Sequence, residues 1–112
     1  MRTKAPEAVR AGLANSVYAV RVERDDETVG IGRIIGDGAL FFEIVDMAVL
    51  PGHQGNGLGD AIMAALMGYL RGNARPGSFV GLFAGEGVSD FYEKYGFEAR
   101  DEKFPGMHTV IP

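Results

Sequence analysis

The sequence predicts a small α/β (α+β) protein built on a mixed, mostly antiparallel central sheet. In the N-terminal half, short β-rich runs alternate with turns rich in glycine and aspartate, a pattern typical of an antiparallel meander. After that, apolar residues recur at three and four positions, which indicates a helix, and another apolar run follows the helix. Hairpins give antiparallel neighbours and a strand–helix–strand crossover gives parallel ones, so we expect both kinds of pairing in one sheet.

The composition indicates a single globular domain spanning residues 1–112. Hydrophobic residues make up 46% of the chain and charged residues 23%, an ordinary mixture for a soluble domain with a modest core. The net charge of −4 argues against a nucleic-acid partner, because phosphate binding needs a basic patch. No apolar run could span a bilayer and no signal peptide opens the chain, so we expect a cytoplasmic protein with no membrane partner.

Metal and thiol chemistry are not expected either. The chain has no cysteine, which excludes disulfides, thiol nucleophiles and thiolate metal sites. Its two histidines, His53 and His108, form no metal-ligand spacing with any carboxylate. We therefore expect no metal.

The first half of the chain is predicted to hold a short helix and three strands. Val9 and Leu13 share one face of the helix. Gly30 and Gly32 interrupt the second strand and indicate a bulge or a close backbone approach. The third strand is long and mostly apolar, so we expect it at the centre of the sheet. The ranges are helix Pro6–Asn15, strand Val17–Val22, polar turn Arg24–Glu27, strand Thr28–Ile35, hairpin turn Gly36–Gly38 and strand Ala39–Leu50.

The second half is predicted to begin with an amphipathic helix and to end with two closing strands. The apolar positions of the helix lie at helical spacing, and Gly96 is a plausible left-handed residue at the end of a second, shorter helix. The ranges are helix Asp60–Leu70, strand Ser78–Ala84, helix Val88–Tyr95, and strands Phe97–Arg100 and Met107–Ile111.

The most informative segment is the glycine-rich stretch Gln54–Gly59 between the third strand and the long helix. A glycine turn at a helix start presents backbone N–H groups and the positive end of the helix dipole to an anion. A P-loop would need Lys-Ser/Thr after its last glycine, but Asp60 follows Gly59 here. A dinucleotide fingerprint fails as well, because G-x-G-x-x-G counted from Gly55 ends on Asp60.

A third phosphate loop does match. Gln54, Gly57 and Gly59 satisfy the pattern Gln/Arg-x-x-Gly-x-Gly/Ala, which resembles the pyrophosphate loop of the GNAT superfamily, the Gcn5-related N-acetyltransferases. A second motif, Phe91–Phe97, resembles the aromatic-Tyr-x-x-x-Gly-Phe helix end found late in that family. The resemblance covers the chain from about Val17 to the C-terminus. It implies a GNAT fold with a β-α-β acetyl-CoA-binding core, and we expect the N-terminal elements to be shortened in this chain.

The resemblance implies acetyl-CoA as the cofactor, with CoA as the product. Gly57 and Gly59 lack Cβ, so the oxygens of a pyrophosphate can approach the main chain closely. In the family, the main chain of the preceding strand binds the pantetheine arm, and a bulge frees an N–H group that polarises the thioester carbonyl. The implied cofactor-binding residues are Met47, Ala48, Val49, Gln54, Gly55, Asn56, Gly57, Leu58, Gly59 and Tyr92.

Two residues are candidates for proton transfer. Tyr92 matches the position of the general acid that protonates the departing thiolate; a phenol of pKa about 10 is protonated at neutral pH. Tyr95 is assigned to the core. Glu43 is the candidate base, because it stands five residues before Ala48, as in the histone-acetylating branch; a solvent-facing or salt-bridged acid is the alternative. Strand alternation puts Glu43 and Met47 on one face and Asp46 on the other, until a bulge resets it.

The acceptor is less well defined. A usual family member begins with a strand and one or two helices that wall the acceptor side, whereas about sixteen residues precede the first strand here. A second copy could supply that wall, which suggests a homodimer. We expect an N-acetyltransferase that acts on a small-molecule amine or a protein amino group. The alternatives are a non-catalytic acyl-CoA-binding or sensing module, and a structural domain whose glycine loop is only a turn.

Overall fold

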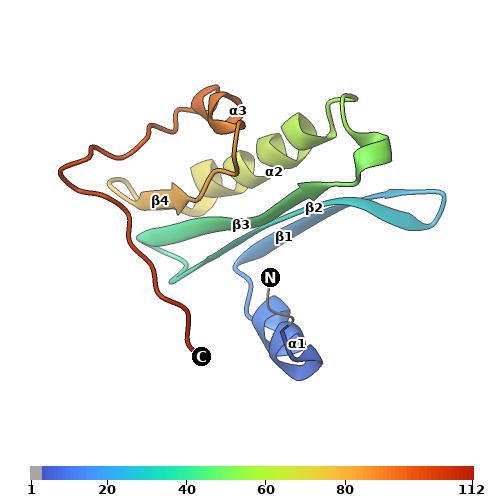
Figure 1. The fold of residues 1–112 in the computed structure, drawn as a ribbon, viewed down its shortest axis with the longest axis horizontal. Coiled ribbons are helices and arrows are strands. Elements are labelled where there is room, and N and C mark those ends of the chain that lie inside the picture. Colours follow the sequence, from blue (N-terminus) through green and yellow to red (C-terminus); the bar gives the residue numbers. More distant parts are fainter. Residues whose placement is uncertain (1–3) are drawn as a thin grey trace. The chain divides into compact units, whose positions relative to one another are not determined.

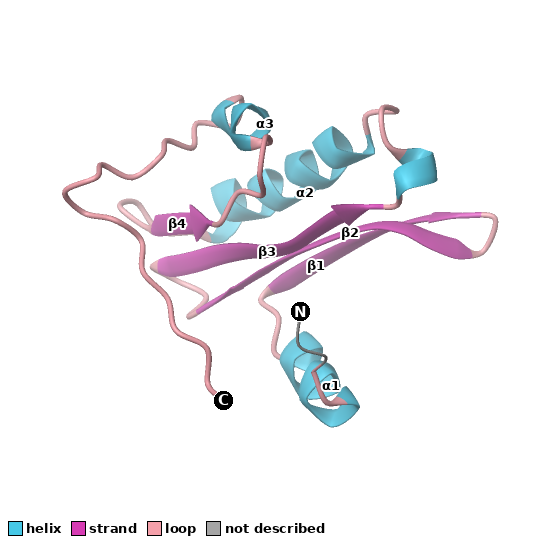
Figure 2. Cartoon of the chain, viewed as in Figure 1, coloured by secondary structure: helices cyan, strands magenta, loops and turns pink. Residues whose placement is uncertain are grey.

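The computed structural model describes residues 4–112, which form two compact units divided after residue 82. The first unit contains helix α1 (Pro6–Ala14), four strands, a short 3-10 turn η1 (Pro51–His53) and helix α2 (Leu58–Asn73) (Figure 1). The second contains helix α3 (Ser89–Glu93) and a long stretch without regular structure (Figure 2).

The sheet of the first unit is mixed, as predicted. Its strands are β1 (Tyr18–Arg24), β2 (Glu27–Gly36), β3 (Phe41–Val49) and β4 (Phe79–Leu82), in the order β1-β2-β3-β4. The first three form an antiparallel meander, and β4 pairs with β3 in parallel after the α2 crossover. The third strand therefore lies inside the sheet, as its apolar character predicted.

Helix α2 packs on one face of this sheet and buries the core (Figure 1). Its apolar stripe, three and four residues apart, is buried together with the α2-facing side chains of the strands. A stacked ring pair, Tyr18 with Tyr69 at 4.6 Å between centroids, also joins β1 to α2. The buried core comprises Val29, Ile34, Phe42, Ile44, Ile62, Met63, Leu66 and Leu70.

Strand β3 contains a bulge opposite Gly32. Ile31 pairs with Ala48, but Arg33 pairs with Val45, so β3 has one residue more than β2 over this stretch. Two residues of β3, Asp46 and Met47, therefore lie opposite the single residue Gly32. Asp46 has φ of 57°, in the left-handed region. A Cβ on Gly32 would lie 2.6 Å from Ile62 Cγ2 and 2.7 Å from Met47 Sδ. The predicted bulge is thus found opposite Gly32, with its extra residue in β3, and the close approach to this glycine is by side chains rather than by backbone.

The two hairpin turns of the meander are formed in different ways. The β1–β2 turn is Asp25-Asp26, with φ of 51° and 64°, so both residues adopt the left-handed conformation of a two-residue hairpin loop. In the β2–β3 turn, the Asp37 carboxylate accepts backbone N–H bonds from Ala39, Leu40 and Phe41 at 2.9, 2.8 and 3.1 Å. These bonds, with that of Leu40 the strongest, lower the pKa of Asp37 below its ordinary value.

In the second unit, the two closing strands predicted at Phe97–Arg100 and Met107–Ile111 are wrong. Neither segment joins the sheet ladder, and residues 97–112 contain only a local turn in which the Phe104 amide donates to Asp101 (Figure 2). β-propensity reflects the fit of a side chain to a paired, half-buried surface, so apolar alternation without a partner strand does not make a strand. Phe104 and Met107 are largely exposed instead.

Within residues 4–112, no helix has the length and apolar character needed to cross a bilayer.

Candidate functional site: the free edge of β3 and the glycine loop

The outer edge of β3 is paired over only half of its length. Its parallel ladder with β4 runs from Phe41 to Ile44, where it meets Leu82, the last residue of β4. Among the described residues, no strand pairs with this edge from Val45 to Val49. The C-terminal half of β3, which starts at the bulge, thus presents main-chain groups on the side away from β2.

The hydrogen-bond alternation of the ladder shows which groups these are. The Leu50 amide donates to the Val29 carbonyl at 2.9 Å, so Leu50 faces β2. Because successive residues of a strand alternate between the two edges, Ala48 also faces β2, whereas Met47 and Val49 face outward. The Gln54 side-chain amide donates to the Val49 carbonyl at 2.9 Å, which agrees with this direction.

The glycine loop connects this edge to the start of α2. Gly55 and Gly57 have φ of 82° and 80°, and a Cβ on either would meet no atom within 4 Å. The backbone conformation, rather than crowding within the chain, therefore requires glycine here. Gly57 is the cap residue of α2 and provides no side-chain hydrogen bond, and the first helical bond runs from the Ala61 amide to the Gly57 carbonyl at 3.0 Å.

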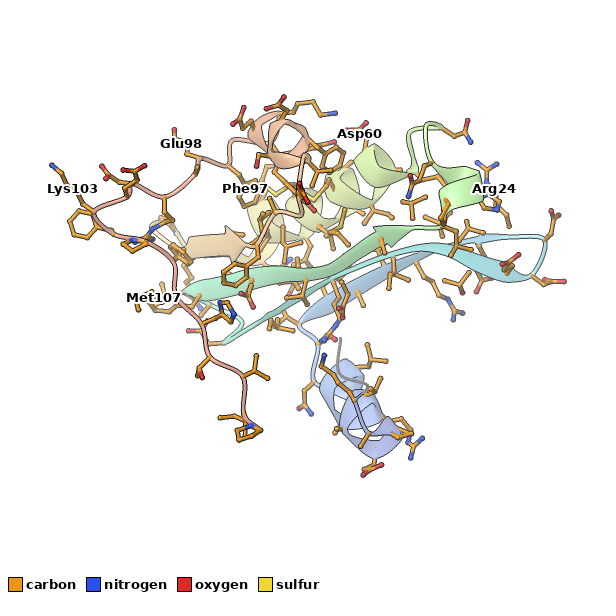
Figure 3. The ribbon with its side chains drawn as sticks, in the orientation of Figure 1. Arg24, Asp60, Phe97, Glu98, Lys103 and Met107 are labelled. Atoms are coloured by element: carbon orange, nitrogen blue, oxygen red, sulfur yellow. The ribbon has the colours of Figure 1, made fainter. Side chains whose placement is uncertain are left out.

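The first turn of α2 thus begins two residues earlier than predicted, at Leu58, and directs its N-terminal amides toward the loop. Asp60 lies in this turn (Figure 3). The Gln54 side chain adds a tie between the loop and the end of β3. The glycine loop therefore joins an unpaired strand edge to a helix N-terminus.

The two carboxylates near the middle of β3 have different surroundings. Glu43 is half-buried and pairs across the ladder with Ile35 and Gly81, on the face opposite the buried Phe42 and Ile44. Asp46 binds Arg33 instead, with 2.6 Å between Oδ2 and Nε. As a bulge was expected to do, it resets the alternation: the Met47 sulfur now lies beside Ile62, above Gly32.

Tyr92 belongs to the second unit, within a cluster of aromatic rings. Its ring packs edge-on against Phe91 and Phe97, with centroids at 5.1 and 6.4 Å. Partial burial raises the pKa of Tyr92 above its ordinary value, because a phenolate would lose hydration there. Tyr95 packs against Phe91 at 5.7 Å.

The end of α3 follows the predicted capping pattern. Gly96 has φ of 89°, and its amide donates to the Glu93 carbonyl at 3.0 Å. The helix is shorter than the predicted range, because only Ser89–Glu93 is helical.

The comparison with protein families decides the classification. The acetyltransferase (GNAT) domain family matches residues 15–99, which is most of the chain. The chain belongs to the GNAT acetyltransferase family.

Known GNAT proteins resemble it in sequence and in fold. It is 39% identical over 101 residues to the "Histone acetyltransferase TAP1" of Glycine max, covering 85% of this chain and 43% of that protein. A crystal structure of a probable acetyltransferase of unknown function from Staphylococcus aureus superposes with a TM-score of 0.91 at 35% identity, covering 99% of this chain and 84% of that one.

A more distant structure shares the fold alone. It is a predicted acetyltransferase from Clostridium acetobutylicum, solved with acetyl-CoA, at a TM-score of 0.71 and 19% identity, covering 96% of this chain and 79% of that one. The chain spans between 31% and 43% of the length of the first curated GNAT relatives.

The structure brings most of the predicted donor-site residues together in the first unit. The residues from Met47 to Val49 form the free edge, and those from Gln54 to Gly59 form the loop and the helix start. Sequence reasoning missed Arg33, the partner of Asp46; a lone arginine between Gly32 and Ile34 of an apolar strand was the available signal. Within residues 4–112, no three His, Asp or Glu side chains are grouped closely enough to hold a metal ion.

Proposed function

We propose that this GNAT protein is an acetyl-CoA-dependent N-acetyltransferase that transfers the acetyl group to a primary amine by direct attack on the thioester. One observation carries the proposal: the β3 bulge, the unpaired strand edge and the uncapped N-terminus of α2 follow one another within the same unit. A strand edge offers amide partners to pantetheine, and a helix N-terminus offers N–H groups and a positive dipole to pyrophosphate.

In this proposal, the loop from Gln54 to Gly59 holds the pyrophosphate of CoA. Met47, Ala48 and Val49 hold the pantetheine arm, whose amides pair with the outward main-chain groups as an added strand would. An N–H group next to the bulge then donates to the thioester carbonyl and stabilises the oxyanion that forms during attack. The relative that was solved with acetyl-CoA supports the choice of cofactor.

The chemical step needs an attacking neutral amine and a proton for the leaving group. The amine nitrogen attacks the thioester carbonyl carbon, the carbon–sulfur bond breaks, and Tyr92 donates its phenolic proton to the thiolate of CoA. Glu43 accepts the proton that the new amide nitrogen loses, through a water molecule. Asp46 is less suited to this role, because its carboxylate binds Arg33.

The acceptor is a primary amine, on a small molecule or on a protein. A histone acetyltransferase among the relatives supports an amine-bearing substrate but leaves both kinds open. We further propose that the protein acts in the cytoplasm as a homodimer, in which the second copy forms part of the binding site for the acceptor amine.

The decisive experiment combines binding with product release. Acetyl-CoA, but not pantetheine, is expected to raise the melting temperature, because a ligand that binds the folded state stabilises it by roughly RT ln(1 + [L]/Kd). An amine panel scored by release of free CoA should then identify a substrate. A melting temperature that does not change up to millimolar acetyl-CoA would contradict the proposal. Binding of acetyl-CoA without release of CoA in the presence of any amine would favour an acyl-CoA sensor.

The role of Tyr92 has its own test. Tyr92→Phe should lower kcat roughly 100-fold or more while leaving Kd for acetyl-CoA nearly unchanged, since general acids contribute about that much. Tyr95→Phe is the matched control within the same helix end. Because the pKa of Tyr92 is raised, wild-type kcat should not fall through loss of this proton below about pH 10. An equal kcat for the two variants would remove Tyr92 from the mechanism.

A further inference from the structure

The bulge in β3 depends on a residue that does not favour its own backbone conformation. Asp46 has φ of 57°, and apart from glycine the left-handed region is unfavourable for L-residues, less so for aspartate and asparagine. In the hairpin, Asp25 and Asp26 share this conformation because a two-residue loop requires it. Asp46 lies within a strand, where no such turn imposes it.

Arg33 supplies the contact that selects this conformation. It stands on β2 opposite Val45, immediately before the bulge, and its Nε donates to Asp46 Oδ2 at 2.6 Å. The Arg33 side chain is only 19% exposed and the Asp46 side chain is 49% exposed, so water competes little for the arginine side of the pair. A charge-assisted bond of this length from a rigid, planar donor specifies geometry as well as charge.

The same guanidinium also reaches the N-terminal segment. Its Nη1 donates to Ser16 Oγ at 3.1 Å and to the Gly12 carbonyl of α1 at 3.4 Å. The Arg33 side chain therefore links α1, the segment before β1 and the bulge. Its three hydrogen-bond partners, Gly12, Ser16 and Asp46, hold it in place. The contact with Ser16 is part-buried.

We propose that Arg33 is a positioning residue for acetyl transfer: through Asp46 it holds the β3 bulge in the backbone geometry that aims the outward Met47 and Val49 amides at the thioester. The inference rests on the proposed function, because the aim of these amides matters only if acetyl-CoA lies along this edge. Arg33 touches neither cofactor nor substrate in this role.

A double-mutant cycle at Arg33 and Asp46 tests this role. Arg33→Met removes the guanidinium and should lower kcat roughly 10- to 100-fold, as small misplacements of reacting groups do, with a much smaller change in Kd for CoA. Asp46→Gly adopts the left-handed conformation without a partner, so it should keep kcat within a few-fold of wild type. In the Asp46→Gly background, Arg33→Met should then cost little further activity.

Arg21→Met is the matched control, because the Arg21–Glu23 pair lies on an exposed part of β1, with side chains 71% and 48% exposed. It should leave kcat and Kd unchanged. If Arg33→Met does not fold, Asp46→Ala removes the same contact and leaves a residue that disfavours φ of 57°, so it should lower kcat in the same way.

A structural readout separates this inference from the proposed function. Amide NMR shifts of Met47 and Val49 should move in Arg33→Met and return toward the wild-type values in the double variant. Unmoved shifts, or a full loss of kcat in the double variant, would overturn the role of Arg33 while acetyl transfer by the wild type still stood. If wild type binds no acetyl-CoA, the proposed function and the catalytic part of this inference fail together, and the shifts still decide whether Arg33 holds the bulge.

Discussion

The glycine loop and the β3 bulge both depend on left-handed backbone, and the chain obtains it in two ways. In the loop, Gly55 and Gly57 adopt φ near 80° at little conformational cost, with no atom within 4 Å of the missing Cβ. In the bulge, Asp46 adopts φ of 57° and is held by the guanidinium of Arg33. The loop conformation is thus a property of residue type, whereas the bulge conformation is a property of a contact across two strands.

This difference has a mechanistic consequence. A pyrophosphate carries charge on several oxygens, and a flexible glycine loop can adjust to it. A thioester carbonyl offers one oxygen, so the N–H that polarises it must be held at one position before the reaction starts. A strand held by an ion pair suits the second task better than a glycine loop would.

The largest stability effect should come from the residue facing the bulge. Gly32→Ala puts a methyl group where Ile62 and Met47 already lie, and overpacking of a filled core costs about 1–3 kcal/mol. Chemical denaturation measures the loss. Gly68→Ala, in the exposed interior of α2 with open space around it, should instead stabilise by about 1 kcal/mol. Equal effects at the two sites would contradict the close approach at the bulge.

The next largest effect on stability is expected in the glycine loop. Gly57→Ala forces an alanine into the left-handed region, which costs about 1–2 kcal/mol, and it should abolish most of the thermal stabilisation by acetyl-CoA. The control is Gly52→Ala, since Gly52 has the same open surroundings without a positive φ. If Gly57→Ala binds acetyl-CoA as wild type does, then the loop does not need its left-handed backbone.

A smaller, pH-dependent effect is expected at the other end of β3. Because the folded pKa of Asp37 is lowered, its contribution to stability is complete above the unfolded pKa and is lost as pH falls through the folded value. The wild type should therefore lose part of its stability below about pH 4, where free aspartate titrates. Asp37→Asn should lose that part at neutral pH already, and melting curves between pH 2 and about 7 would compare the two. Parallel curves would mean that the three N–H bonds add nothing.

The smallest effect isolates the cost of left-handed backbone away from the site. Asp26→Gly should stabilise the protein by about 0.5–1 kcal/mol, because glycine adopts the hairpin conformation more readily. It should leave acetyl-CoA binding unchanged. A destabilised variant would show that Asp26 makes a contact that outweighs its backbone cost.

Much of the fold could be predicted from local patterns. The meander, the long helix after the glycine loop, the parallel partner strand and the left-handed Gly96 all rest on periodicity or on turn chemistry within a few residues. The two predicted closing strands failed because apolar alternation states only that a segment could pair, and a strand forms only where a partner edge accepts it.

The candidate site divides in the same way. From the sequence alone, the glycine spacing in Gln54–Gly59 and the aromatic motif Phe91–Phe97 indicated the family, because both motifs resemble those of GNAT proteins. Only the tertiary structure decided that β3 leaves β4 after Ile44, that Asp46 takes the extra position, and that Arg33 holds it. A register shift and an ion pair between strands depend on which residues face each other across the sheet, and no local pattern states that.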